Sequence, residues 1–373
     1  MNILTLCLSP DLGGLELYAY RSAMKLREKA DLVFVAHPHG KLVQKLADSP
    51  IKTHYLSSAF YRLPLISAFR LARLIDNHSI DIVHMHWGKD LALAALAKKL
   101  SRRKPTLVYT RQMNVTRSKK DWYHQFLYKE VDRLITITHL LADKYTEFLG
   151  ETFSSRITPL YYGVNQPSRT LSKTDINKKR GELGFDDNDF ITGCFGRLEQ
   201  GKGQYLLIEA IKLAADAGKT IKALIVGHEM NPGYRDELKR LAAELDVSEH
   251  VAFHDFVPDP QSLMQICNCM VLTTYEETFG LVLPEAMRAG IAVIGSNAGG
   301  VPEIIDHDET GLLFESKNST DLSRQLLKLR SDANLTQQLA SNGKKKSDSL
   351  FNNKLHFEKL FSILENLNDP DEH

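Results

Sequence analysis

The sequence predicts an α/β protein made of two domains, each a parallel sheet flanked by helices. Short apolar segments of strand length alternate with longer helical patterns, as they do in parallel α/β units. This alternation runs through residues 1–165 and then restarts after a polar stretch. A length of 373 residues also favours two domains over one. Two successive series of this kind indicate two Rossmann-like domains.

In the first half, strands are expected wherever short runs are rich in β-branched, aromatic and leucine residues. They are Asn2–Leu8, Asp31–Ala36, Lys52–Leu56, Asp81–His86, Thr106–Thr110 and Arg133–Thr138. Helical patterns lie between them, for example at Glu16–Lys29 and Leu91–Leu100. We therefore assign residues 1–165 to an N-terminal Rossmann-like domain.

The second half repeats the pattern. Its expected strands are Phe190–Gly196, Ile221–Gly227, His250–Phe256, Cys269–Thr274, Ile291–Ser296 and Gly311–Phe314. The seam is expected within Gly163–Asp189, which is polar and has no clear hydrophobic period. These features define a C-terminal domain at residues 166–350. Residues 351–373 form an amphipathic helix and a tail, which could pack back on the N-terminal domain.

Bulk properties exclude several classes of protein. No apolar run approaches the roughly 20 residues that cross a bilayer, and the N-terminus lacks the basic region of a signal peptide. The four cysteines, Cys7, Cys194, Cys267 and Cys269, have neither metal-ligand nor disulfide-like spacing. Buried thiols in a reducing cytoplasm are the simplest interpretation.

The net charge of +1 hides a difference between the halves. Residues 1–165 contain 24 Lys and Arg against 14 Asp and Glu, so the first half is basic and the second acidic. This polarity fits an anionic partner for the first half, or two solvated surfaces that complement each other.

Two glycine-containing segments each follow the first expected strand of one half of the chain. Gly13 and Gly14 precede a helix, where backbone amides and the helix dipole suit a phosphate, although a plain turn would look the same. Gly196–Gly203, "GRLEQGKG", nearly matches a phosphate-binding P-loop, but Gly203 stands where a hydroxyl should hold Mg²⁺. A nucleoside triphosphatase is therefore disfavoured. Arg197 and Lys202 remain as cations suited to a diphosphate.

Two carboxylates flank the Phe279–Gly280 pair in "YEETFGLVLPEAMRAG". Glu277 is expected on a loop and Glu285 one turn into a helix that Gly290 ends. Paired carboxylates commonly hold sugar or ribose hydroxyls. Alternatively, Glu285 stabilises the helix dipole and Glu277 is a solvated loop acid. A second glycine pair, at Gly299 and Gly300, fits an anionic ligand or tight packing equally well.

Together these segments, with "DETGLLF" at Asp308–Phe314, resemble the retaining family 4 glycosyltransferases (group 1), as found in bacterial surface-polysaccharide and lipopolysaccharide synthesis. The resemblance implies a GT-B fold with an interdomain cleft, in which residues 1–165 bind the acceptor and residues 166–350 bind the nucleotide sugar. It also implies hexose transfer from a nucleotide-diphosphate sugar to a cell-envelope glycan or glycolipid. A nucleotide-sugar epimerase of the same architecture, or an inactive glycan- or nucleotide-binding subunit, is the alternative.

The resemblance also implies roles for individual residues. Glu285 would bind the ribose hydroxyls. Glu277 would bind the hexose, helped by the amides of Phe279, Gly280 and Leu281. Arg197, Lys202 and the Gly13–Gly14 pair would bind the diphosphate, and family members of this kind generally need no metal. The resemblance therefore implies neither a metal site nor a cofactor. Taken with Glu277, the two cations are the expected catalytic residues.

One position departs from the family pattern. Many relatives carry a histidine facing the donor sugar at the end of the strand that corresponds to Thr106–Thr110, whereas Arg111 and Gln112 stand here. His84 and His86 lie one strand earlier and share a strand face. His86, Arg111 and Gln112 are therefore candidates for the acceptor side, with a structural role as the alternative for the histidines.

The N-terminal half also carries basic and aromatic segments. They include Phe60, Tyr61, Arg62, Leu65, Ile66, Phe69, Arg70 and Arg73, then Arg102–Pro105, then Thr116–Lys129 with Trp122 and Tyr123. Such surfaces suit an anionic saccharide or glycolipid acceptor, or the inner face of the cytoplasmic membrane. No nucleic-acid-binding module is recognisable, so nucleic acid is not an expected partner.

Overall fold

The structure is a computed structural model that describes residues 1–57, 63–115 and 120–368. It divides into two compact units. The first contains Met1–Tyr161 and Lys354–His373, and the second contains Tyr162–Asn353. The chain thus passes between units twice, and the C-terminal helix belongs with the first unit. Part of the basic segments lies outside the described residues, namely Phe60, Tyr61, Arg62 and residues 116–119.

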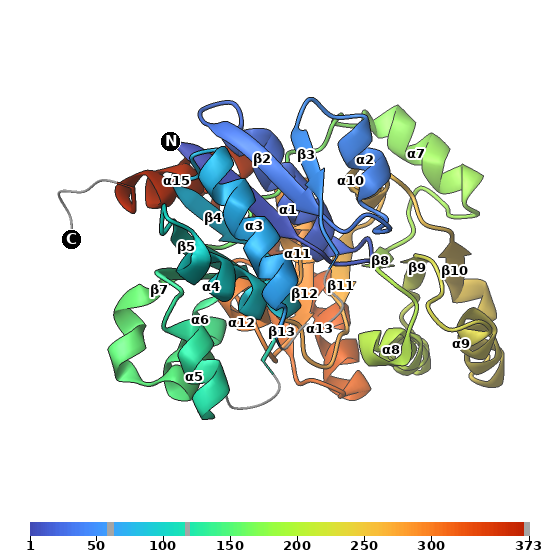
Figure 1. Ribbon diagram of the computed structural model, residues 1–373. Coiled ribbons are helices and arrows are strands. Elements are labelled where there is room, and N and C mark those ends of the chain that lie inside the picture. The colour runs from blue at the N-terminus through green and yellow to red at the C-terminus, as the bar shows by residue number, and fades with distance from the viewer. Residues whose placement is uncertain (58–62, 116–119, 369–373) are drawn as a thin grey trace. The chain divides into compact units, whose positions relative to one another are not determined.

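The first unit contains a seven-stranded sheet in the order β3-β2-β1-β4-β5-β6-β7, with every neighbouring pair parallel (Figure 1). Its strands are β1 (Asn2–Cys7), β2 (Asp31–Ala36), β3 (Lys52–Tyr55), β4 (Ile82–Met85), β5 (Thr106–Arg111), β6 (Arg133–Thr136) and β7 (Ile157–Pro159). Each of the six strands expected in this half is present, and β7 is an addition. The order of strands reverses between β1 and β4, which creates a topological switch point.

The helices of this unit are α1 (Gly14–Leu26), α2 (Val43–Ala47), α3 (Leu65–Asn77), α4 (Leu91–Leu100), α5 (Trp122–Tyr128), α6 (His139–Leu149) and α15 (Asn353–Asn366). The last helix is bound to α1 through aromatic residues. Nδ1 of His356 lies 2.7 Å from the carbonyl oxygen of Tyr161, and its Nε2 lies 2.8 Å from the hydroxyl of Tyr18. The ring of Phe357 also stacks on Tyr18.

The second unit contains a six-stranded parallel sheet in the order β10-β9-β8-β11-β12-β13. Its strands are β8 (Ile191–Phe195), β9 (Lys222–Val226), β10 (Val251–His254), β11 (Cys269–Leu272), β12 (Ala292–Ser296) and β13 (Leu312–Phe314). All six match the expected strands. The chain reverses its direction of winding between β8 and β11, so this sheet has its own switch point.

The helices of the second unit are α7 (Lys173–Glu182), α8 (Gln204–Asp216), α9 (Tyr234–Glu244), α10 (Pro260–Met264), α11 (Val282–Arg288), α12 (Val301–Ile304), α13 (Ser319–Ser331) and α14 (Ala333–Leu350). Helix α7 lies in the segment that was expected to form the seam. It has no apolar stripe and is held by one buried cation instead. The guanidinium of Arg180 donates to the carbonyl oxygens of Ile266 and Asp187 at 2.7 and 2.8 Å.

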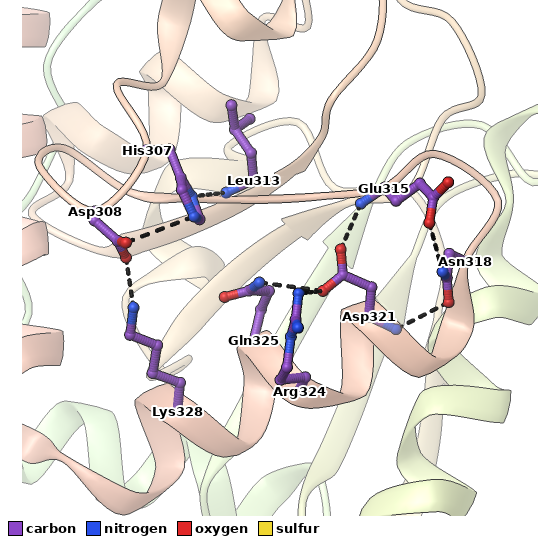
Figure 2. Close-up of polar contacts among 9 residues, drawn as sticks. All are labelled: His307, Asp308, Leu313, Glu315, Asn318, Asp321, Arg324, Gln325 and Lys328. Atoms are coloured by element: carbon purple, nitrogen blue, oxygen red, sulfur yellow. Dashed lines mark hydrogen bonds and ion pairs between the residues drawn. The ribbon is translucent and has the colours of Figure 1, made fainter.

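The "DETGLLF" segment has a structural role in this unit. Asp308 adopts a left-handed conformation (φ 64°) and pairs with Lys328 of α13 (Figure 2). A side chain at Gly311 would meet the carbonyl oxygen of Val293 at 2.8 Å. Beyond β13, the carboxylate of Asp321 accepts the backbone N–H of Glu315 at 2.8 Å, as Figure 2 shows. These contacts fix the turn before β13 and the start of α13.

Candidate active site

Two loops meet at the switch point of the second sheet. One follows β8 and contains Gly196–Gly203, and the other follows β11 and contains Thr273–Gly280. Because β8 and β11 are neighbours and parallel, both loops leave the same edge of the sheet. Ligands of open α/β sheets bind at this kind of position. The four charged residues singled out from the sequence, Arg197, Lys202, Glu277 and Glu285, therefore come from one sheet edge.

Hydrogen bonds join the two loops directly. The hydroxyl of Thr273 donates to the carbonyl oxygen of Lys202 at 2.7 Å, and the N–H of Tyr275 donates to that of Gly201 at 3.2 Å. Gly203 is left-handed (φ 67°), and a Cβ there would lie 2.4 Å from the carbonyl oxygen of Thr273. A serine or threonine cannot fit at that position. Close packing of the loops thus explains why a glycine replaces the P-loop hydroxyl.

Lys202 and Glu277 form an ion pair across the junction. The Lys202 ammonium lies 2.7 Å from Oε2 of Glu277, and both side chains are 22% exposed. An ammonium has three N–H donors, of which this pair uses one, so the cation can still bind the oxygens of an anionic ligand. Arg197 is more exposed, at 51%, with its guanidinium 3.2 Å from Oε1 of Glu199. The amide of Gln204 holds the backbone of Arg197 through its carbonyl oxygen at 2.8 Å.

The second glycine pair fixes the backbone of Glu277. The N–H of Gly300 donates to the carbonyl oxygen of Glu277 at 2.8 Å. Gly299 is left-handed (φ 59°), and a Cβ there would lie 2.1 Å from the same oxygen. The sequence left open whether this glycine pair binds an anionic ligand or packs tightly against the protein, and the structure shows tight packing. The pair holds one of the expected catalytic residues in place.

The segment after Glu277 leads into α11. Phe279 is 2% exposed, and its ring contacts Tyr162 and Phe351 edge-to-face, with centroids 5.4 and 5.7 Å apart. Its buried side chain anchors the loop, while Gly280 (φ 87°) makes the turn and Leu281 is half-buried. Glu285 lies in the first turn of α11 and is half-buried. Gly290 follows α11 with φ 76°, which agrees with its expected position after the helix end.

Gly13 and Gly14 open helix α1 at the switch point of the first sheet. Gly13 is the N-cap, and its N–H donates to Oε2 of Glu16 at 2.7 Å. Gly13 has an extended conformation, and a Cβ on Gly14 would have no neighbour within 4 Å. Neither glycine is therefore required by local packing or by a left-handed turn. Their missing side chains leave the backbone at this helix N-terminus accessible to a ligand.

The acceptor-side candidates differ in their surroundings. His86 is fully buried, with Nδ1 3.5 Å from Nε2 of Gln112, and its ring lies edge-on against Tyr18. Nε2 of His84 lies 2.7 Å from the hydroxyl of Thr110. Burial lowers the pKa of His84 to about 3 and holds the pKa of His86 well below its usual value. Both rings are therefore neutral at physiological pH.

Arg111 supports the loop after β5. Its guanidinium donates to the hydroxyl of Tyr109 and to the carbonyl oxygen of Asn114, both at 2.9 Å. A side chain at Gly88 would collide with both partners of the first bond, at 2.9 Å from each. Arg111 and Tyr109 therefore pack closely against Gly88 in the loop after β4.

Comparison with known proteins agrees with this geometry. The family model "Glycosyl transferases group 1" matches residues 175–346, and the model "Glycosyltransferase Family 4" matches residues 12–166. The chain belongs to the group 1 glycosyltransferases. The two matched ranges follow the two units, and both carry parts of the switch-point loops. The fold is therefore GT-B, as the sequence motifs implied.

Two relatives of this glycosyltransferase match over most of its length. N-acetyl-alpha-D-glucosaminyl L-malate synthase of Bacillus anthracis is 25% identical over 310 residues, which cover 81% of this chain and 78% of the relative. The putative glycosyltransferase EpsD of Bacillus subtilis is 28% identical over 289 residues, 74% of each chain. Among solved structures, HepE of Anabaena in complex with UDP superimposes with a TM-score of 0.86 at 23% identity, covering 98% of this chain and 100% of that one. That likeness shows the fold.

Sequence reasoning missed one buried acid of the glycosyltransferase, Asp90. Oδ2 of Asp90 accepts the N–H of Leu8 at 2.9 Å, and Oδ1 has no hydrogen-bond partner within the described residues. Burial raises its pKa to about 8 against the opposing effect of the Leu8 bond. An aspartate just ahead of a helix looks like an ordinary N-cap in sequence, so only the contact with Leu8, 82 residues away, reveals it.

Asp90 predicts a pH-dependent stability. The pKa of Asp90 in the fold lies above its value in the unfolded chain. Its contribution to the free energy of unfolding is therefore greatest below about pH 4 and falls as the pH rises towards about 8, by up to about 1.4 kcal/mol per pH unit. Asp90→Asn keeps an oxygen for Leu8 and cannot ionise. We expect its urea midpoint to exceed that of the parent protein at about pH 9 and to approach it at about pH 5. Asp216→Asn, at an exposed site, serves as control; parallel pH profiles for Asp90→Asn and parent would contradict the assignment.

None of the helices described is both long and apolar enough to span a bilayer.

Proposed function

We propose that this glycosyltransferase transfers a hexose from a nucleotide-diphosphate sugar, with retention and without a bound metal, to an anionic cell-envelope glycan or glycolipid. The observation that supports this most is the junction of the two loops, which brings Lys202 to Glu277 at 2.7 Å beside Arg197 and the start of α11. Cations and carboxylates so placed can bind a diphosphate and sugar hydroxyls at the same time.

Each group of residues has a role in the proposed reaction. Lys202 and Arg197 bind the donor's diphosphate. The N-terminus of α1 at Gly13 and Gly14 is suited to a phosphate. Glu277 orients the hexose, helped by the backbone of Phe279, Gly280 and Leu281. Glu285 holds the ribose. The UDP named with the Anabaena structure makes a uridine nucleotide the first donor to test.

In the proposed transfer, the bond between the sugar's anomeric carbon and the diphosphate oxygen breaks. The acceptor oxygen forms its bond on the same face, and its proton passes to the leaving diphosphate. No protein base is needed, which fits an acceptor side where Arg111 and Gln112 stand in place of the usual histidine. His86 is buried and neutral, so we assign it to positioning. The main catalytic work is stabilisation of negative charge on the diphosphate by Lys202 and Arg197.

The basic N-terminal half supports an anionic acceptor and a place in the cytoplasm at the inner face of the membrane. Residues 1–165 hold 24 Lys and Arg against 14 Asp and Glu. The Bacillus anthracis relative is named for a product that contains malate, itself an anion. Surface-polysaccharide or lipopolysaccharide synthesis supplies acceptors of this charge.

Nucleotide release tests the proposal. A thermal-shift screen of UDP, ADP and GDP first identifies the base, because a ligand that binds only the native state raises the melting temperature. We then expect the parent protein to release that nucleoside diphosphate from its sugar conjugate, and Glu277→Ala to release it at least about tenfold more slowly. The exposed Glu244→Ala should behave like the parent.

Three other outcomes would contradict the proposal. Equal, background release by parent and Glu277→Ala would indicate a binding subunit. Conversion of the sugar without acceptor and without released nucleotide would indicate an epimerase. Activity abolished by a chelator and restored by a divalent cation would contradict metal-independent transfer.

A further inference from the structure

The outward face of helix α3 is apolar where a surface helix normally is polar. Leu65, Ile66 and Phe69 are 55%, 74% and 50% exposed, and Leu63, just before the helix, is 61% exposed. The inward face of the same helix is also apolar, with Ala68 among its buried residues. Contiguous exposed apolar side chains on one element mark an interaction surface. We call Leu63, Leu65, Ile66 and Phe69 the α3 patch.

Cations flank the α3 patch along its own stretch of the sequence. Arg70 and Arg73 are exposed on the next turns, and the guanidinium of Arg73 lies over the ring of Phe69, 4.4 Å from its centroid. From residue 49 to residue 75 the sequence contains no Asp or Glu. An apolar face that continues into arginines is typical of helices that lie in a membrane interface, with their charged ends at the headgroups.

A second group of exposed aromatic side chains lies on α5 of the same unit. Helix α3 packs on α4, and α4 packs on α5 (Figure 1). On α5, Trp122 is 81% and Phe126 is 42% exposed, and the ammonium of Lys99 lies 5.1 Å from the Phe126 ring centroid. Helices that follow parallel strands begin at the carboxyl edge of the sheet, so the first turns of α3 and α5 share that edge. Gly13 and Gly14 leave the same edge.

We propose that the α3 patch, with Arg70, Arg73 and Trp122, docks the protein on an anionic phospholipid bilayer. The charge pattern favours a membrane over a second copy of the chain. In a twofold-symmetric dimer the same surface meets itself, which would bring arginines together, and residues 49–75 supply no acid to pair with them. A lipid headgroup layer supplies the missing negative charge. The docking proposal rests on the membrane contact proposed above and names the surface that makes it. Its test uses neither donor nor acceptor, so docking can be disproved independently of the transfer reaction.

Vesicle co-sedimentation of the full chain tests the proposal. We expect binding to vesicles of phosphatidylglycerol and phosphatidylcholine in equal parts, and little binding to phosphatidylcholine alone. Arg70→Gln with Arg73→Gln should weaken that binding about 25-fold, at about fivefold for each cation. Ile66→Ser with Phe69→Ser should weaken it at least about tenfold. Raising the salt concentration should weaken the parent's binding and change little for the arginine pair variant.

Matched controls separate docking from general effects. Lys178→Gln with Lys239→Gln removes two exposed cations from the second unit, and Leu213→Ser removes a partly exposed apolar side chain from α8. Both should bind vesicles like the parent, and all variants should keep the parent's melting temperature. The proposal is overturned if the parent ignores anionic vesicles, or if the α3 variants bind as the parent does. It is also overturned if sedimentation velocity shows a dimer that Ile66→Ser with Phe69→Ser dissociates.

Discussion

Replacing Lys202 with methionine is expected to lower kcat by about 100- to 1,000-fold. One preorganised donor to a developing negative charge contributes about 2.7–4 kcal/mol to lowering the barrier. The Lys202 side chain is only 22% exposed, so water cannot fully replace it, and methionine keeps the length of the stem without the charge. The measurement is the steady-state rate of nucleotide release at saturating donor. The loss should appear mainly in kcat because the charge grows during bond cleavage.

Two further variants test the cause of the rate loss in Lys202→Met. Lys212→Met removes an exposed ammonium that pairs with Asp216 on α8 and should leave the rate unchanged. Combining Lys202→Met with Glu277→Ala tests the ion pair, because residues in direct contact are not additive. If the double variant is slower by the full product of the two single losses, the pair does not act as a unit. A Lys202→Met enzyme with parental kcat would contradict the catalytic assignment altogether.

The sequence predicted regular elements well because each carries its own local pattern. Every expected strand is found, since buried parallel strands read as short apolar runs. Helix α7 was not predicted because nothing apolar marks it, and the contact of Arg180 with Ile266 joins positions 86 residues apart. The same limit applies to His356 and Tyr18, which are 338 residues apart and carry no local sign of their hydrogen bond.

For the candidate site too, the sequence predicted some features and only the structure showed the others. Residue type and position after a strand suggested Lys202 and Glu277, but their pairing across 75 residues appears only in the fold. The two glycine pairs look alike in sequence and differ in structure. Gly14 has open space around its Cβ position, whereas Gly299 is surrounded by the backbone of Glu277. Sequence can indicate that a backbone must come close to something, but not whether that is a ligand or the protein itself.

Gly299→Ala is therefore expected to damage both stability and catalysis. A left-handed alanine costs roughly 1–2 kcal/mol, and here its Cβ would also lie 2.1 Å from the carbonyl oxygen and 2.9 Å from the nitrogen of Glu277. Backbone atoms cannot rotate away as a side chain can, so the Glu277 loop must move. We expect a drop in melting temperature of several degrees. The folded fraction should also release nucleotide at least about tenfold more slowly, because Glu277 loses its position against Lys202.

Gly218→Ala isolates the steric part of this effect. Gly218 is also left-handed, at φ 71°, but an added Cβ there has no neighbour within 4 Å. The Gly218→Ala variant should therefore lose only the stability that a left-handed alanine costs, and it should release nucleotide at the parental rate. If Gly299→Ala and Gly218→Ala lose equal stability and both keep full activity, the contact between Gly299 and Glu277 does not position the catalytic loop. A loss of activity confined to Gly299→Ala would instead show that packing beneath Glu277 sets the geometry on which the transfer depends.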